Sequence, residues 1–143
     1  HSCLVNDDRD AIGSAPPLGH GHRHDVVISE LQRIFPRPDL LDAVNGCVDK
    51  GQRCIAHCLV SLVEGDTELA ECASKVHEMQ AICDAFSYLV AANSEYSKAY
   101  SKICITACED CEQICREHEE HFECKDCADA CAALVKAIKK SFA

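Results

Sequence analysis

The sequence predicts an all-α protein, an antiparallel up-down-up-down four-helix bundle with a cysteine-lined core, preceded by a mostly irregular N-terminal tail and a short extra helix. Three observations support this prediction. Long stretches of helix-forming residues follow Asp39, and short breaks between them imply antiparallel neighbours. No segment of any length alternates as a strand would. Cysteines recur at the spacing of helical turns, which indicates that each helix presents one sulfur-bearing face.

The first 38 residues differ in composition from the remainder. Residues 1–24 are predicted to form a flexible tail, because SAPPLGHGHRH mixes Ser, Pro, Gly and His without periodicity. Residues 25–38 are predicted to contain a short helix, DVVISELQRIF, and a connection in which Pro36 and Pro38 end it. Residues 39–143 are expected to form the cysteine-lined bundle as one domain.

Four helices are predicted in the bundle, with short polar breaks between them. They run from about residue 39 to 63, 67 to 92, 95 to 117 and 124 to 141. Asp39 is the candidate N-cap of the first helix, and Asp66 or Thr67 is that of the second. The breaks are Glu64-Gly65-Asp66, Asn93-Ser94 and the segment HEEHFE.

Composition narrows the class of protein. A chain with 13 Cys is unusually rich in sulfur, yet disulfide scaffolds are typically shorter than this one, and an odd number cannot pair completely. A net charge of −10 without a basic run argues against binding to nucleic acid. The longest uncharged run is too short to cross a bilayer. A start at His1 without Met favours an exported, periplasmic protein, with a cytoplasmic one as the alternative.

The cysteines form one stripe on each predicted helix, because a helix turns by about 100° per residue. The stripes consist of Cys47, Cys54 and Cys58 on the first helix, Cys72 and Cys83 on the second, Cys104, Cys108, Cys111 and Cys115 on the third, and Cys124, Cys127 and Cys131 on the fourth. Met79, the only methionine, falls on the second stripe. On the first three helices the stripe covers about 16 Å. All of these sulfur atoms are therefore expected to face the bundle axis.

An antiparallel arrangement also predicts how the two ends of the bundle differ. Cys58, Cys72, Cys115 and Cys124 should gather at one end, where consecutive helices meet. The other end should be apolar and closed, lined by Phe86, Leu89, Val90, Leu134 and Ile138.

Several roles for so many thiols compete. Cysteine can serve as a small core hydrophobe, and thiols on facing helices can form disulfides for structural or redox purposes. The pairs Cys108-x2-Cys111 and Cys124-x2-Cys127 have the spacing of a zinc site, and four cysteines can hold an iron–sulfur cluster. Each of these alternatives accounts for only part of the pattern.

Cu(I) accounts for the whole pattern. It is soft, prefers thiolate and thioether ligands and accepts low coordination numbers, so a continuous stripe could hold on the order of one ion per cysteine. A Cu(I) ion that replaces a thiol proton leaves the charge of the core unchanged. A copper chaperone would need few ligands at an exposed site. No nucleophile–base pair stands out, so the chain is not expected to be an enzyme.

The sequence resembles the bacterial copper storage proteins over roughly residues 39–140. The resemblance rests on Cys47, the stretch RCIAHC, Cys72 with Cys83, CITACEDCEQIC and ECKDCADAC. It implies storage of many Cu(I) ions along the axis of a four-helix bundle, entrance at one end, and a homo-oligomer, commonly a tetramer. Two departures suggest a smaller capacity: Gly51 interrupts the first stripe, and Leu134 and Ile138 occupy positions where relatives often continue the last one.

The histidines have two interpretations each. His57 matches the family histidine that helps to bind copper at the entrance, although its direction lies about 100° off the stripe and also fits an exposed residue. His118 and His121 lie in the loop at the same end, where they could capture copper or simply be solvated. His20, His22 and His24 alternate in the tail and could bind Cu(II) or Zn(II) weakly.

Overall fold

The computed structural model describes residues 37–143 and consists there of four α-helices without a strand. The helices are α3 (Pro38–Val63), α4 (Ala70–Ala91), α5 (Ser97–Arg116) and α6 (Phe122–Ser141). The predicted all-α class is therefore confirmed. The predictions for the tail, for the short helix DVVISELQRIF and for His20, His22 and His24 fall outside the described residues.

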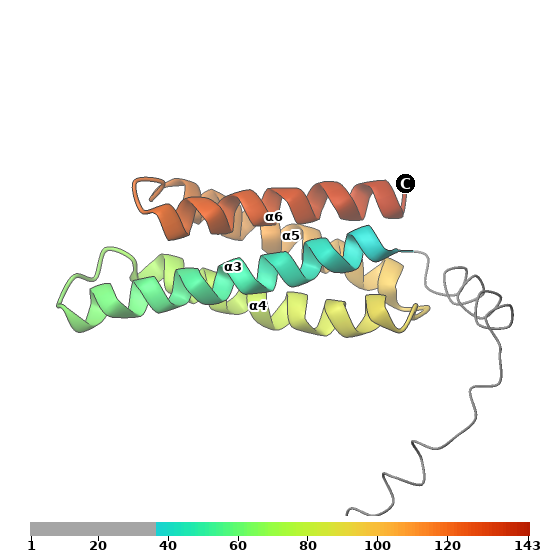
Figure 1. The fold of residues 1–143 in the computed structure, drawn as a ribbon, viewed down its shortest axis with the longest axis horizontal. Coiled ribbons are helices and arrows are strands. Elements are labelled where there is room, and N and C mark those ends of the chain that lie inside the picture. Colours follow the sequence, from blue (N-terminus) through green and yellow to red (C-terminus); the bar gives the residue numbers. More distant parts are fainter. Residues whose placement is uncertain (1–36) are drawn as a thin grey trace, which may run out of the picture. The chain divides into compact units, whose positions relative to one another are not determined.

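The helices form an antiparallel bundle in which each helix has two neighbours. α3 packs against α4 and α6, and α5 packs against the same two helices. The α3–α4 and α5–α6 connections lie together at one end, on the left of Figure 1, and the α4–α5 connection lies at the other end with the C-terminus. None of the helices in residues 37–143 is long and apolar enough to cross a membrane.

The ends of α3 and α4 lie where the sequence predicts breaks, and the backbone shows why. After α3, Gly65 adopts a positive φ of 90°, and the amide of Asp66 donates to the carbonyl of Ser61 at 2.9 Å. After α4, Asn93 adopts the same left-handed backbone conformation, with a φ of 49°. The amide of Ser94 then donates to the carbonyl of Leu89 at 2.9 Å. Both ends are Schellman motifs, which satisfy carbonyls that the helix leaves free.

The predicted N-caps are wrong. α3 begins at Pro38, so Asp39 lies inside its first turn, where a carboxylate favours the helix dipole. α4 begins only at Ala70, because residues 67–69 form a turn. Asp66 accepts a hydrogen bond from the amide of Glu68 at 2.9 Å, and this local turn replaces the expected cap.

The core consists of thiols at one end and apolar side chains at the other. The apolar part contains the buried residues Leu40, Val44, Phe86, Val90, Leu134 and Ile138, while Leu89 is half-buried. Two buried serines, Ser97 and Ser101, continue the α5 stripe into this part. Arg37 covers the end by donating to Asn93 Oδ1 at 3.0 Å and lying 4.5 Å above the ring of Phe142. The apolar end is thus closed.

Candidate metal centre

The twelve cysteines of residues 37–143 are all buried and none is in a disulfide. Their side chains have no exposed surface, and neither has the side chain of Met79. This follows from the helical spacing, because every cysteine lies on the face that its helix turns toward the axis. The result is a continuous run of sulfur atoms inside the bundle.

One group of sulfur atoms lies toward the end formed by the α3–α4 and α5–α6 connections, which we call the sulfur-rich end. We call this group the outer cluster. It comprises Cys54, Cys58, Cys72, Cys111, Cys115, Cys124 and Cys127. The Cys72 sulfur lies 3.6 Å from that of Cys115 and 4.0 Å from that of Cys124. The Sγ atoms of Cys54, Cys58, Cys72 and Cys124 all lie within 4.8 Å of one another.

A second group lies deeper, and we call it the inner cluster. It comprises Cys47, Cys83, Cys104, Cys108 and the thioether of Met79. The Cys83 sulfur lies 3.6 Å from that of Cys104 and 3.7 Å from that of Cys108. Cys47 contacts Met79 Sδ at 3.6 Å. Cys131 lies beside this cluster, 3.7 Å from Cys47, and also forms a group within 4.8 Å with Cys111 and Cys127.

Met79 fills space that Gly51 leaves open on the neighbouring helix. A Cβ atom on Gly51 would lie 3.2 Å from Cε of Met79 and 3.1 Å from the side chain of Gln80. Gln80 is itself fixed, because its Nε2 donates to the carbonyl of Val48 at 2.9 Å. The interruption of the first stripe is therefore matched by a methionine that reaches across from α4.

Contacts between the thiols perturb their acidity. A hydrogen bond from Cys108 lowers the pKa of Cys104 to about 5, and one from Cys111 lowers the pKa of Cys115 to about 6, because an S–H group that donates stabilises the neighbouring thiolate. The hydrogen bond with Cys104 and burial raise the pKa of Cys83. Thiols that are still protonated release their protons when a metal binds.

Two histidines meet at the sulfur-rich end. Nε2 of His57 lies 2.9 Å from Nδ1 of His121, so one ring donates its N–H and the other accepts. Nδ1 of His57 is also 3.5 Å from a carboxylate oxygen of Glu123. His57 directly precedes Cys58, and His121 lies three residues before Cys124. Both imidazoles are half-buried and adjoin the outer cluster in the sequence.

His118 lies at the same end. Its Nδ1 is buried without a hydrogen bond and lies 3.6 Å from a carboxylate oxygen of Glu68. The sequence could not predict the contact between Glu68 and His118, because Glu68 precedes α4 and His118 follows α5. Glu68 and Glu120 also lie within 4.8 Å of a ring nitrogen of His121. All three predicted histidines of this end are therefore in contact with acidic residues or with each other.

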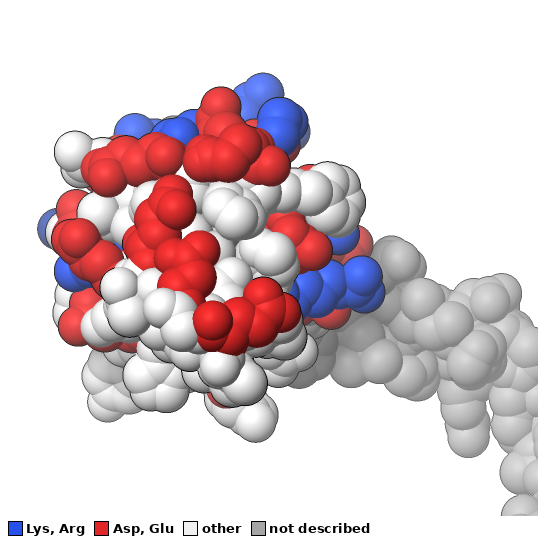
Figure 2. All heavy atoms as spheres, turned by 90° about the vertical axis from the view of Figure 1, so that its left-hand side faces the viewer, with Lys and Arg blue, Asp and Glu red and all other residues white. Residues whose placement is uncertain are grey.

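Acidic side chains surround the sulfur-rich end, and Figure 2 views the molecule from this side. The two connections, residues 64–69 and 117–121, contain no Lys or Arg. Their acidic residues are Glu64, Asp66, Glu68, Glu117, Glu119 and Glu120, all of them exposed. Such a collar of one sign attracts cations to the end where the outer cluster lies.

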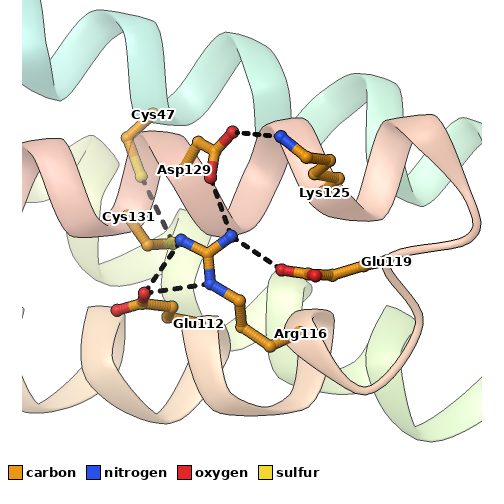
Figure 3. A network of polar contacts seen from close by, with 7 residues as sticks. All are labelled: Cys47, Glu112, Arg116, Glu119, Lys125, Asp129 and Cys131. Carbon is orange, nitrogen blue, oxygen red and sulfur yellow. Dashed lines mark hydrogen bonds and ion pairs between the residues drawn. The ribbon is translucent and has the colours of Figure 1, made fainter.

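An ion-pair network fixes the α5–α6 connection (Figure 3). Arg116 donates to Asp129 at 2.7 Å, to Glu119 at 3.0 Å and through two nitrogens to Glu112 at 3.0 and 3.1 Å. Lys125 donates to the second carboxylate oxygen of Asp129 at 3.2 Å. The network joins the end of α5 to α6 and so holds the rim of the sulfur-rich end in place.

This arrangement is suited to soft metal ions. Sulfur atoms 3.6–4.0 Å apart on different helices can share a metal with small shifts of their side chains. The imidazoles add nitrogen ligands at the rim. The helical spacing predicts the sulfur atoms of this site but not Glu68, Glu120 and Glu123. For these carboxylates, the only signal in the sequence is the acidic composition near the breaks between the helices.

Comparison with known families gives the same indication. The sequence model of a family described as copper storage protein matches residues 36–143, which is most of the chain. A search of curated protein sequences found no match.

Proposed function

Since the chain belongs to the copper storage protein family, we propose that it stores many Cu(I) ions as thiolate complexes inside the bundle. The observation that supports this most directly is the set of twelve free, buried cysteines in contact with one another. Cu(I) is the soft ion that accepts two or three sulfur ligands, and bridging thiolates would let the number of ions approach the number of cysteines.

The proposed ligands are the twelve cysteines together with Met79, and the proposed entrance is the sulfur-rich end. There His57 and His121 would receive copper and pass it to Cys58 and Cys124. His118 would assist them, since its neighbour Glu68 also lies near His121. A chaperone is less well supported, because it would hold its ion at an exposed site and the cysteines here are fully buried. Storage requires no catalytic step, and the bundle core is occupied by sulfur.

We also propose that the protein forms homo-oligomers, with the tetramer as the expected state. Several large apolar side chains are exposed on the bundle surface, among them Val63 at 87% and Phe122 at 68%. Burial of such side chains is a common source of association. Light scattering coupled to size-exclusion chromatography measures the mass directly, and a monomer of 15.6 kDa would contradict this part of the proposal.

The test of storage is an anaerobic titration of fully reduced protein with Cu(I), in the presence of a chromophoric Cu(I) chelator as competitor. Roughly ten or more tightly bound ions per chain are expected, on the order of one per cysteine. A stoichiometry of one or two ions would contradict storage and favour a zinc, iron–sulfur or redox role. Measurement of zinc and iron in the isolated protein separates those alternatives.

A further inference from the structure

The sulfur atoms of the core form two groups, the outer and the inner cluster, which are in contact through one cysteine. Within the outer cluster every cysteine has a close sulfur neighbour, and the same holds for the inner cluster. Cys131 is the one cysteine of residues 37–143 that has sulfur partners in both: Cys47 and Cys108 on the inner side, and Cys111 and Cys127 on the outer side. Figure 3 shows the contact between Cys47 and Cys131.

The division arises because thiols are missing from two helices in the middle of the core. On α5 the stripe contains Cys104, Cys108, Cys111 and Cys115, and on α3 the same spacing would place a thiol at residue 51. Gly51 stands there instead. On α4, Val76 and Met79 occupy the two turns between Cys72 and Cys83. The middle of the core therefore has thiols only on the side of α5 and α6.

Met79 does not replace the missing thiol as a carrier. Its side chain fills the space beside Gly51 and reaches Cys47 at 3.6 Å, but its sulfur belongs to the inner cluster alone. A thioether has no proton to exchange and carries no charge, so it does not balance the charge of a passing Cu(I) ion as a thiolate does.

From these contacts, and given the storage function proposed above, we propose that Cys131 is the relay thiol through which Cu(I) passes between the outer and inner clusters. A Cu–S bond to Cys111 or Cys127 breaks as one to Cys131 forms, and the ion then moves to Cys108 or Cys47. The proton of each receiving thiol passes to the thiolate that is released, and copper stays Cu(I) throughout. The inner cluster is thus a separate pool that fills and empties through one residue.

The experiment compares Cys131→Ser with the matched variant Cys104→Ser. Both remove one buried thiol, but Cys104 has contacts only within the inner cluster. Reduced protein is mixed anaerobically with Cu(I) and sampled over time. Free thiols are then alkylated and located by mass spectrometry, which reports when each cysteine becomes protected. Circular dichroism melting confirms that both variants are folded, and Cys131→Ala repeats the comparison without a polar atom.

The relay predicts that Cys131→Ser leaves protection of Cys58, Cys72 and Cys124 unchanged, because these outer cysteines have no contact with Cys131. Protection of Cys83, Cys104 and Cys108 should slow by at least roughly tenfold. In Cys104→Ser, the remaining inner cysteines should be protected at the wild-type rate, with a loss on the order of one ion. Equal rates in the two variants would overturn the relay but leave storage intact, whereas a wild-type protein that binds only one or two ions would overturn storage itself.

A rescue variant tests the cause of the division. Gly51→Cys combined with Met79→Ala places a thiol between Cys47 and Cys54 and removes the side chain that fills this space. Added to Cys131→Ser, these changes should restore fast protection of the inner cysteines. A folded triple variant that stays slow would overturn the assignment of the division to the missing thiol at residue 51.

Discussion

The imidazoles of His57 and His121 join α3 to the start of α6 through a nitrogen–nitrogen contact of 2.9 Å at the sulfur-rich end. The cysteines near them in the sequence, Cys58 and Cys124, have no exposed surface. A metal ion that reaches these thiols must therefore displace side chains at the rim. The pair of rings is well suited to this step, because each can exchange its hydrogen bond for a bond to the metal.

His57→Ala is expected to change the rate of copper transfer more than the amount stored. Loss of the imidazole should slow uptake from a chelator by about fivefold, equivalent to about 1 kcal/mol in the barrier, with the final number of ions unchanged. Stopped-flow absorbance of a chromophoric donor measures the rate. His77→Ala is the control, since His77 is exposed on α4 and has no contact with the outer cluster. Equal rates in both variants would mean that His57 is only a surface residue.

Leu69→Ala should make copper uptake faster and the protein less stable. Leu69 directly precedes α4, is completely buried and lies three residues before Cys72, so its side chain helps to cover the sulfur-rich end. Truncation should lower the free energy of unfolding by about 2–3 kcal/mol. Leu59→Ala is the matched control, because Leu59 is half-exposed near the same end of α3. Uptake that is unchanged in Leu69→Ala would show that copper takes another path.

Arg116→Ala is expected to lower the free energy of unfolding by about 1 kcal/mol at pH 7, a modest value because its ion pairs are partly exposed. Hydrogen bonds from Arg116 and then from Lys125 hold the pKa of Asp129 below its usual range. This contribution is therefore present above the ordinary carboxyl pKa of about 3.9 and is lost as the pH falls through the lower folded value.

Chemical denaturation of Arg116→Ala and wild type at pH 7 and at about pH 3 tests this sign. The difference between the two proteins should shrink at the acidic pH. Arg53→Ala provides the comparison, because Arg53 forms only the exposed pair with Asp49 and should cost no more than about 0.5 kcal/mol. A difference that grows with acidity would contradict the assignment to Asp129.

Removal of copper should leave the helical bundle folded. The thiols pack as small apolar groups when no metal is present, and the apolar end contributes Phe86, Leu134 and Ile138 to the core. Far-ultraviolet circular dichroism before and after chelation should therefore agree, although the loaded protein should melt at a higher temperature. A collapse of helicity on chelation would instead indicate a metal that is required for folding.

The helical period of 3.6 residues was sufficient to predict the fold and the burial of the cysteines. The stripes on four helices could face only one axis, and the breaks at Gly65 and Asn93 contained residues that accept a positive φ. The N-caps were predicted wrongly because an aspartate near the start of a helix can take other local roles than capping. Asp39 lies in the first turn of α3, and Asp66 accepts a hydrogen bond within the turn before α4. A shift of two or three residues in a cap changes little in the packing that determines the bundle.

The partners of the histidines could not be predicted, because they come from other elements. His57 lies off the stripe of its own helix, and only the meeting of α3 with the α5–α6 connection places it against His121. Likewise, the sequence shows Gly51 only as an interruption of the cysteine stripe on α3. Its pairing with Met79 depends on the relative height of α3 and α4, which periodicity within a helix does not define.

The acidic collar at the sulfur-rich end has a counterpart at the far end of the bundle. There the C-terminal half of α6 carries Lys136, Lys139 and Lys140, and the first half of α5 carries Lys98 and Lys102. The opposite signs give residues 37–143 an electric dipole directed along the bundle. The field of this dipole should steer a cationic copper carrier to the acidic collar before the two proteins make contact. It should steer an anionic carrier to the lysines at the other end. Ionic strength should therefore affect the two kinds of carrier in opposite directions.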